Sequence, residues 1–293
     1  MATDEPIIGV IGGSGLYEMS GLTETGRVEI DTPYGAPSDA YVLGELGGRR
    51  LAFLPRHGAG HRILPSELNF RANIYGFKKL GADVILSVSA VGSLREEIKP
   101  GDVVVPDQFI DRTRGRISTF FGDGVVAHVS FADPFCPVLS ATLARAAREA
   151  GATVHEGGTY VCMEGPQFST RAESHLYRSW GGDVIGMTNL QEAKLAREAE
   201  ICFATLALAT DYDCWRSGDD DVAIGDVLAV LRANAQTARA TIAAAATAIE
   251  DERSCGCRRA LEHAVITDRD KIPTERLEDL AVIAGRVLSS EES

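Results

Sequence analysis

The sequence lacks an excess of positive charge, and it lacks any long apolar run. Lysine and arginine total 29 against 42 acidic residues, so the formal net charge is −13. This balance argues against general binding to nucleic acid or to a membrane surface, although a local basic pocket can hold a small anion. The most apolar helical stretch, residues 240–249, is alanine-rich and too short to cross a bilayer. We therefore expect a protein that binds neither nucleic acid nor a membrane.

The sequence also lacks a secretion signal and any obvious internal division. Residues 1–19 contain no basic region followed by a long apolar core, which a signal peptide would need. No internal repeat, low-complexity segment or linker rich in proline and glycine splits the chain. We therefore predict a cytoplasmic protein with one main folding unit.

Cysteine is scarce, and only two of the six cysteines are close neighbours in the sequence. Cys136, Cys162, Cys202 and Cys214 stand singly in apolar or mixed segments, which predicts buried thiols. The segment Cys255-Gly256-Cys257 could form a strained disulfide or half of a metal site. No second close pair of cysteine or histidine accompanies it, which disfavours a metal, and a reducing cytosol favours two free thiols.

Short apolar segments alternate with helical ones along the chain. The expected strands are residues 6–10, 51–54, 83–88, 103–106, 159–163, 184–186 and 201–210. The expected helices are residues 66–80, 137–150, 171–180, 189–199, 222–250 and 277–288. This alternation is typical of the α/β class, and it predicts one domain with a mixed central sheet flanked by helices.

Two aspartates follow the longest apolar run. Residues 201–210 predict a buried strand, and Asp211 and Asp213 come directly after it. Ligands of α/β sheets bind at the carboxyl ends of strands, and burial there raises the pKa of a carboxyl group. Such a group could donate a proton to a leaving group near neutral pH. Taken alone, an ordinary surface turn explains the two aspartates equally well.

Groups suited to an anion follow four other expected strands. Residues 12–15 (Gly-Gly-Ser-Gly) offer backbone N–H groups and a hydroxyl, and Arg56 and His57 offer charge-assisted donors. Residues 89–93 (Ser-Ala-Val-Gly-Ser) and 187–188 (Met-Thr) add further hydroxyls. Taken alone, each segment is explained about as well by a tight turn, a solvated loop or a local cap as by anion binding. The glycine spacing of a dinucleotide site is absent, which disfavours a dinucleotide-dependent oxidoreductase.

A long series of motifs matches a known family. The motifs are residues 8–16 (IGVIGGSGL), 56–58 (RHG), 64–66 (LPS), 89–97 (SAVGSLREE), 107–113 (DQFIDRT), 164–169 (EGPQFS), 171–174 (RAES) and 209–215 (ATDYDCW). In this order they resemble the methylthioadenosine phosphorylase branch of the purine nucleoside phosphorylase superfamily. The resemblance covers about residues 7–250. We therefore expect residues 1–250 to form the phosphorylase domain and residues 251–293 to be a C-terminal extension packed on it.

The resemblance implies a role for each matching residue. The matched phosphate-site positions are Ser14, Arg56, His57, Ser89, Ala90 and Thr188. The matched nucleoside positions are Phe168 under the purine, Met187 at the ribose hydroxyls, Asp211 and Asp213 at the base, and His128, Ile224 and Val227 at the 5′ pocket. His128 would reach the pocket of a neighbouring subunit, because the family assembles as trimers with shared active sites. The family's C-terminal residue that closes this pocket has no match here.

The implied reaction is phosphorolysis of 5′-deoxy-5′-methylthioadenosine to adenine and 5-methylthioribose 1-phosphate. Asp211 would protonate N7 of the leaving purine, inorganic phosphate would be the co-substrate, and no metal or organic cofactor is needed. The alternative is a phosphorylase for 6-oxopurine nucleosides such as inosine, guanosine or methylthioinosine. Aspartate at 211 and 213 favours a 6-amino purine, because a carboxylate accepts from an amino group and repels an oxo group unless it is protonated. A non-catalytic nucleoside-binding protein would need the same pocket, and a turnover assay separates the two.

Overall fold

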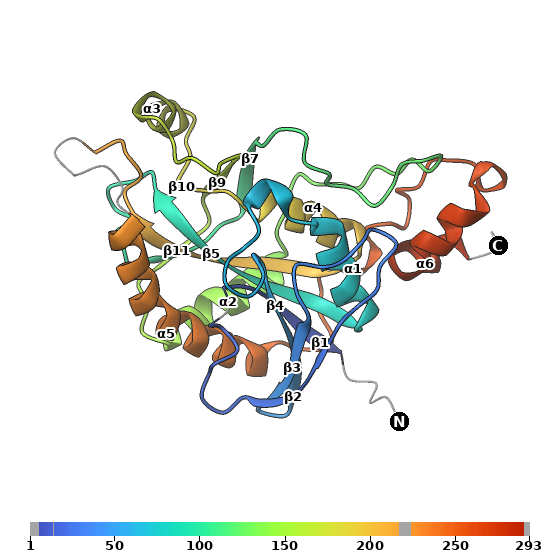
Figure 1. Ribbon diagram of the computed structural model, residues 1–293, viewed down its shortest axis with the longest axis horizontal. Coiled ribbons are helices and arrows are strands. Elements are labelled where there is room, and N and C mark those ends of the chain that lie inside the picture. The colour runs from blue at the N-terminus through green and yellow to red at the C-terminus, as the bar shows by residue number, and fades with distance from the viewer. Residues whose placement is uncertain (1–5, 14, 217–223, 290–293) are drawn as a thin grey trace.

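The computed structural model describes residues 6–13, 15–216 and 224–289. In helix α5 (Ile224–Ala248), the side chains of residues 224–229 and 231–233 lie outside this description. The described chain forms one large sheet with helices packed against it (Figure 1). The sequence-based prediction of an α/β fold with a mixed central sheet is confirmed.

Four long parallel strands form the centre of the sheet. They are β1 (Ile7–Gly12), β4 (Arg49–Pro55), β5 (Ala82–Ser93) and β11 (Cys202–Asp211), in the spatial order β4-β1-β5-β11. Because they are parallel, their carboxyl ends lie at the same edge, where ligands of such sheets bind. The other strands are β2 (Thr23–Val28), β3 (Tyr41–Leu46), β6 (Val103–Val105), β7 (Gln108–Arg112), β8 (Val154–Glu156), β9 (Thr159–Met163) and β10 (Val184–Gly186). Several of these pair antiparallel, which makes the sheet mixed.

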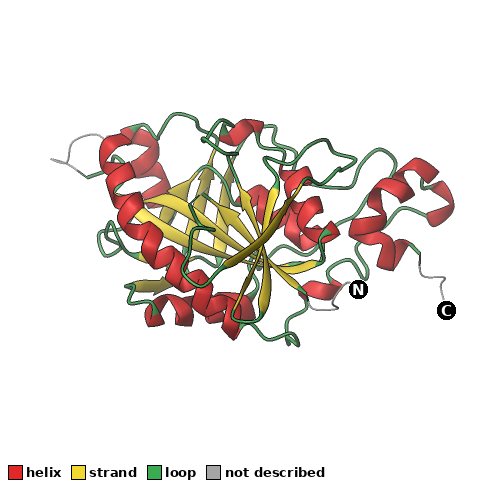
Figure 2. Ribbon diagram, turned by 60° about the horizontal axis from the view of Figure 1, so that its bottom comes forward, coloured by secondary structure: helices red, strands yellow, loops and turns green. Residues whose placement is uncertain are grey.

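Helices cover both faces of this sheet (Figure 2). On one face α2 (Pro137–Glu149) and α5 share a core cluster with Ile8 and Val10 of β1. On the other face α1 (Phe70–Lys79) and α4 (Leu190–Glu198) share a second cluster with Ile7 and Ile11. Successive side chains of a strand point to opposite faces, so a strand that is covered on both sides is apolar throughout. This is why the apolar runs of the sequence locate the central strands.

Some expected boundaries are wrong. The expected helix 66–80 is a short 3₁₀ turn at Pro65–Glu67 followed by α1, which begins after Asn69. Asn69 caps α1 through its Oδ1, which accepts from Ala72 N at 3.1 Å, and its Nδ2 donates to the Tyr34 carbonyl at 2.7 Å. The expected strand 83–88 continues to Ser93, so residues 89–93 belong to β5 and are not a turn after it.

The sequence does not predict β2, β3, β7 or β8. β2 has the sequence TETGRV and is mostly exposed, so it carries no apolar pattern. β8 is only three residues long. Both rely on pairing with a neighbouring strand, which local sequence does not encode.

The C-terminal residues pack against the main sheet and helices. Leu280 and Ile283 of α6 (Thr274–Leu288) join the core cluster that contains α1. The carboxylate of Glu200 accepts hydrogen bonds from Leu261 N at 3.0 Å and from the Arg286 guanidinium at 2.5 and 3.0 Å. Among the described residues, no helix has the length and apolar character needed to cross a membrane.

Candidate active site

A cavity of about 450 Å³ opens at the carboxyl edge of the central strands. The predicted site residues that line it are Arg56, His57, Ser89, Ala90, Phe168, Met187, Thr188, Asp211 and Asp213. They lie directly after β4, in β5, at or just after the end of β11, in the loop after β9 and in the segment between β10 and α4. The parallel order of β4, β1, β5 and β11 therefore brings residues that are far apart in the sequence to one pocket.

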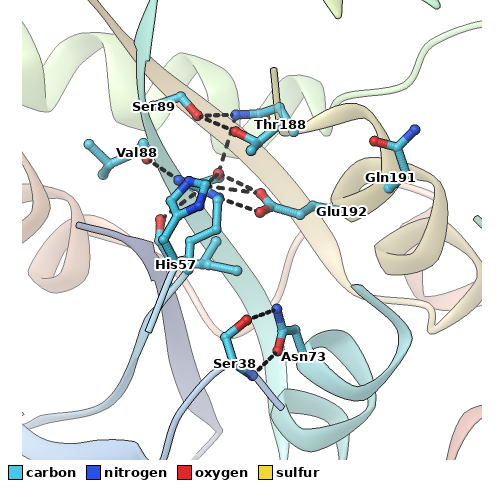
Figure 3. A network of polar contacts seen from close by, with 12 residues as sticks. Ser38, His57, Asn73, Val88, Ser89, Thr188, Gln191 and Glu192 are labelled. Carbon is cyan, nitrogen blue, oxygen red and sulfur yellow. Dashed lines mark hydrogen bonds and ion pairs between the residues drawn. The ribbon is translucent and has the colours of Figure 1, made fainter. Parts of the chain in front are cut away.

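Arg56 is buried at the floor of this cavity and is bound by a carboxylate. Its Nε donates to Glu192 Oε1 at 2.5 Å and its Nη2 donates to Glu192 Oε2 at 3.1 Å. The Nη1 donates to the Val88 carbonyl at 2.8 Å, and Nη2 also donates to Ser87 Oγ at 2.6 Å (Figure 3). Glu192 is fully buried, so each charge in this pair compensates the other. The guanidinium is held rigidly at the edge of the cavity.

His57 lies beside Arg56 and is neutral near pH 7. Burial, and then the charge of Arg56, lower the pKa of His57 to about 4. Its Nδ1 lies 2.8 Å from the carbonyl oxygen of Ile63. A carbonyl only accepts, so the proton of the neutral ring is on Nδ1 and the Nε2 lone pair is available to accept a hydrogen bond.

Two hydroxyls form the rest of this end of the cavity. Ser89 Oγ lies 3.2 Å from Thr188 Oγ1, and both side chains are buried. Asn189 Nδ2 donates to Ser89 Oγ at 2.8 Å, which fixes the serine hydroxyl. Asn189 itself has a positive φ of 88° at the turn into α4, and its side chain accepts from Thr205 Oγ1. Together with Arg56, these groups form an end of the cavity that suits an oxyanion.

Two carboxyl groups lie at the other part of the cavity. Asp211 Oδ2 accepts from Thr210 Oγ1 at 2.7 Å, and Asp211 Oδ1 accepts from Asp213 N at 2.7 Å. Asp213 Oδ2 is buried and has no hydrogen-bond partner in the described part of the chain. Burial raises the pKa of Asp211, and burial together with the nearby Asp211 charge raises the pKa of Asp213. These groups therefore hold a proton at a higher pH than an exposed aspartate does.

Gly92 of β5 has no side chain, and this lets the Asp211 carboxyl lie close to the β5 backbone. A Cβ atom on Gly92 would lie 3.0 Å from Asp211 Oδ1 and 3.1 Å from Ile185 Cγ2. Both distances are shorter than a comfortable contact. A side chain here would push against the Asp211 carboxyl and the Ile185 side chain, so glycine leaves room for both.

Phe168 and Met187 also line the cavity. Phe168 is 49% exposed at the rim of the cavity, in the loop before α3 (Arg171–Ser179). The backbone carbonyl of Met187 accepts a hydrogen bond from Arg116 Nη1 at 2.6 Å. Arg116 also pairs with Glu164 at 3.1 Å, so this arginine joins the loop after β9 to the segment before α4.

Other predicted residues are not in this cavity or are not described. Ser14 lies outside the described residues, although its neighbours Gly13 and Gly15 line the cavity. The side chains of Ile224 and Val227 also lie outside the described part of the chain. His128 is described, is exposed, and does not line the cavity of its own chain.

Sequence reasoning missed the residues that support the anion end. Glu192 and Asn189 lie in a segment expected as an ordinary helix, where a polar residue is usually solvated. Ser87 lies inside an apolar strand. A hydroxyl group in such a strand is buried and needs a hydrogen-bond partner, and this was the one signal in the local sequence that Ser87 has one.

Four cysteine side chains form a second group, outside the cavity. Cys136 and Cys202 lie next to Cys255 and Cys257, with one sulfur from each within 4.8 Å of the others. The sequence offers no second close pair of cysteine or histidine, but the fold brings two single cysteines to this segment. The sequence could not reveal this, because the contacts join distant segments. None of the six cysteines is in a disulfide, as expected, but of the four that were expected to be buried, Cys214 is only half-buried.

Comparison with known proteins identifies the family of this chain. The model of the phosphorylase superfamily matches residues 7–248, and the chain belongs to this family. It is 62% identical to the S-methyl-5′-thioadenosine phosphorylase of Geobacter sulfurreducens over 96% of this chain and 99% of that protein. The resemblance stated from the sequence motifs is therefore confirmed.

Solved structures show the same similarity. A methylthioadenosine phosphorylase from an antarctic soil metagenomic library superposes with a TM-score of 0.91 at 52% identity, over 96% of this chain and 99% of that one. A variant adenosine/methylthioadenosine phosphorylase of Schistosoma mansoni, solved with methylthioadenosine, gives a TM-score of 0.82 at 36% identity. That alignment covers 88% of this chain and 96% of the other.

Proposed function

We propose that the protein catalyses phosphorolysis of 5′-deoxy-5′-methylthioadenosine. The observation that carries the proposal is one cavity with oxyanion donors at Arg56, Ser89 and Thr188 and buried carboxyls at Asp211 and Asp213. A nucleoside that reacts with phosphate needs both kinds of group, one for the nucleophile and one for the leaving base. The names of the similar proteins support the same substrate.

The proposed chemistry breaks the bond between C1′ and N9 and forms a bond between C1′ and a phosphate oxygen. The electron pair of the broken bond goes to the purine, which leaves more easily once N7 receives a proton. Asp211, with its raised pKa, is the proposed acid. The phosphate loses its own proton as the new bond forms, and this proton passes through solvent to Asp211 and restores the acid, so one proton moves in net from phosphate to the purine. The neutral His57 can accept a hydrogen bond from that P–OH group through Nε2.

The proposed base recognition uses Asp213. The Asp213 carboxyl lines the cavity and, when ionised, can accept a hydrogen bond from a 6-amino group. A 6-oxopurine would need a protonated carboxyl at the same place, and the raised pKa values of both aspartates keep this second substrate class open. The proposal uses no metal or organic cofactor in the reaction, because the phosphate is the nucleophile and the acid is a side chain.

We also propose a homotrimer in the cytoplasm with active sites shared between subunits. His128 is exposed and outside the cavity of its own chain, and the same segment exposes Ile117 (58%) and Val126 (46%). Exposed apolar side chains on one segment support an interface with another copy. Sedimentation should show a trimer, and a fully active monomer would rule out the shared site.

The activity is tested by phosphate-dependent release of free base. Methylthioadenosine, adenosine and inosine are compared at equal concentration, with and without phosphate. We expect the highest kcat/KM for methylthioadenosine and no release without phosphate. Binding of nucleoside without turnover would contradict the proposal, and a preference for inosine would support the 6-oxopurine class.

A further inference from the structure

Four cysteine sulfurs form a buried cluster at the end of the sheet opposite the cavity. Cys136 precedes α2, Cys202 begins β11, and Cys255 and Cys257 lie in the C-terminal segment after α5. The four Sγ atoms lie within 4.8 Å of one another, and Cys202 Sγ is 3.4 Å from Cys255 Sγ. Three segments that are far apart in the sequence therefore contribute to one group of thiols.

The spacing of the sulfurs fits a tetrahedral metal site. Zinc binds thiolate sulfur at about 2.3 Å, which gives about 3.8 Å between two sulfurs of a tetrahedron. A disulfide needs about 2.05 Å between its sulfurs. The sulfurs of Cys202 and Cys255, at 3.4 Å, are close to the first value and far from the second.

The position of Cys136 in the fold suits a thiolate ligand. Cys136 is the residue before the first turn of α2, where unpaired N–H groups stabilise a negative charge.

A buried cation supports the negative charge that such a site would carry. Arg253 is 3% exposed in its side chain, and its Nη2 donates to Asp83 Oδ2 at 2.6 Å. The buried Nε has no hydrogen-bond partner among the described residues. A site of four thiolates and Zn²⁺ has a net charge of −2, which this guanidinium partly compensates.

The cluster is also accessible to an ion. Cys255 and Cys257 line a second cavity of about 580 Å³, together with Asp133 and Arg197. Gly256 between the two cysteines has no atom within 4 Å of the position that a Cβ would occupy. An entry path and a complete set of ligands are both features of a site that can be loaded after folding.

We propose that Cys136, Cys202, Cys255 and Cys257 bind one structural Zn²⁺ ion that joins the C-terminal segment to α2 and β11. Four protein ligands leave no open position for a substrate, so the ion stabilises the fold and takes no part in the reaction. Binding releases the remaining thiol protons, up to four for each ion. Asp211 is nine residues further along β11, about 30 Å at 3.3 Å per residue, so the two sites are separate.

The test measures the metal content of the full chain, purified with reductant from cells grown with added zinc. We expect one zinc per chain by elemental analysis. Cobalt added to the zinc-depleted protein should give the strong visible absorption of tetrahedral cobalt–thiolate sites. Cys255→Ser and Cys202→Ala should each lower the zinc content at least tenfold, whereas Cys214→Ser, outside the cluster, should leave it unchanged.

Thermal unfolding provides a second readout in case a variant folds poorly. Removal of zinc from the unmodified protein by a chelator should lower Tm, and re-addition of zinc should restore it. The proposal is overturned if the reduced, folded protein contains no zinc and gives no cobalt–thiolate absorption. Intact mass then tells whether the cysteines are four free thiols or two disulfides, and both results would contradict a metal site.

Discussion

The carboxylate of Glu192 accepts two hydrogen bonds from the guanidinium of Arg56, at 2.5 and 3.1 Å, and both side chains are buried. The residue expected to bind the phosphate therefore carries a charge that is already compensated inside the protein. Removal of either partner leaves a buried charge alone, which typically costs about 3–5 kcal/mol. Phosphate binding and stability are thus linked at Arg56.

This pair gives the first prediction. Arg56→Ala should raise the KM for phosphate much more than it changes the affinity for adenine, because the lost contact is local. It should also lower the free energy of unfolding. The double variant Arg56→Met/Glu192→Gln should regain part of the stability, because no lone charge remains, without regaining phosphate affinity. Chemical denaturation and initial rates measure the two effects, and equal losses for phosphate and adenine would contradict the local role.

The second prediction concerns the proposed acid. Asp211→Ala should reduce kcat for methylthioadenosine by about 10²–10⁴-fold, the usual effect of losing a general acid. Phosphate binding should persist, because Arg56, Ser89 and Thr188 are unchanged. Single-turnover rates and phosphate affinity measured by calorimetry test this. A variant with nearly unchanged kcat would remove Asp211 from the mechanism.

The third prediction concerns the choice of base. Asp211→Asn, with Asp213 retained, should shift the preference from 6-amino towards 6-oxopurines, because an amide can donate where a carboxylate only accepts. The ratio of kcat/KM for methylthioadenosine over that for methylthioinosine should fall. An unchanged ratio would mean that another group recognises the base.

The fourth prediction concerns Glu198, a buried carboxyl outside the cavity. Its Oε2 accepts from Phe120 N and its Oε1 accepts from Thr119 Oγ1, both at 2.7 Å. Burial raises the pKa of Glu198 to about 7 despite these bonds. A carboxyl whose pKa is raised on folding stabilises the protein most below its unfolded pKa, and this contribution is lost as pH rises through about 7.

Glu198→Gln should therefore raise Tm at pH 8 and have a smaller effect at pH 5. The amide can still accept from Phe120 N, and its NH₂ group can donate to the Thr119 hydroxyl. Calorimetric scans at the two pH values provide the measurement, and the exposed Glu278→Gln is the control. A benefit that grows as the pH falls would contradict the sign.

The sequence predicts the central fold because its strands are apolar on both faces. Residues 159–163 and 184–186 are strands with the expected bounds, and the expected helix 137–150 is α2 to within one residue. Edge strands such as β2 escape prediction, since their residues are exposed and depend on a partner strand. The local sequence pattern therefore predicts which strands are buried, but it does not predict which strands pair with each other.

Local sequence also does not show which distant side chains meet, and this limits the prediction of the Arg56–Glu192 pair and of the cysteine cluster. Arg56 and Asp211 follow apolar runs, so their position at a strand end is visible in the sequence. Glu192 has the same local context as an exposed helical glutamate, and only the packing of α4 on the sheet reveals its partner. Cys202 and Cys255 are 53 residues apart, and no local pattern joins them.

The backbone of β5 also determines what length of ligand the cavity accepts. Ser89 belongs to the anion end and Gly92 lies against Asp211, three residues further along the same strand. At about 3.3 Å per residue, these positions are about 10 Å apart. This separation is fixed by covalent geometry and does not depend on any side chain. Substitutions in the cavity can therefore change which base or 5′ group is accepted, while the distance between the proposed phosphate and base positions stays constant.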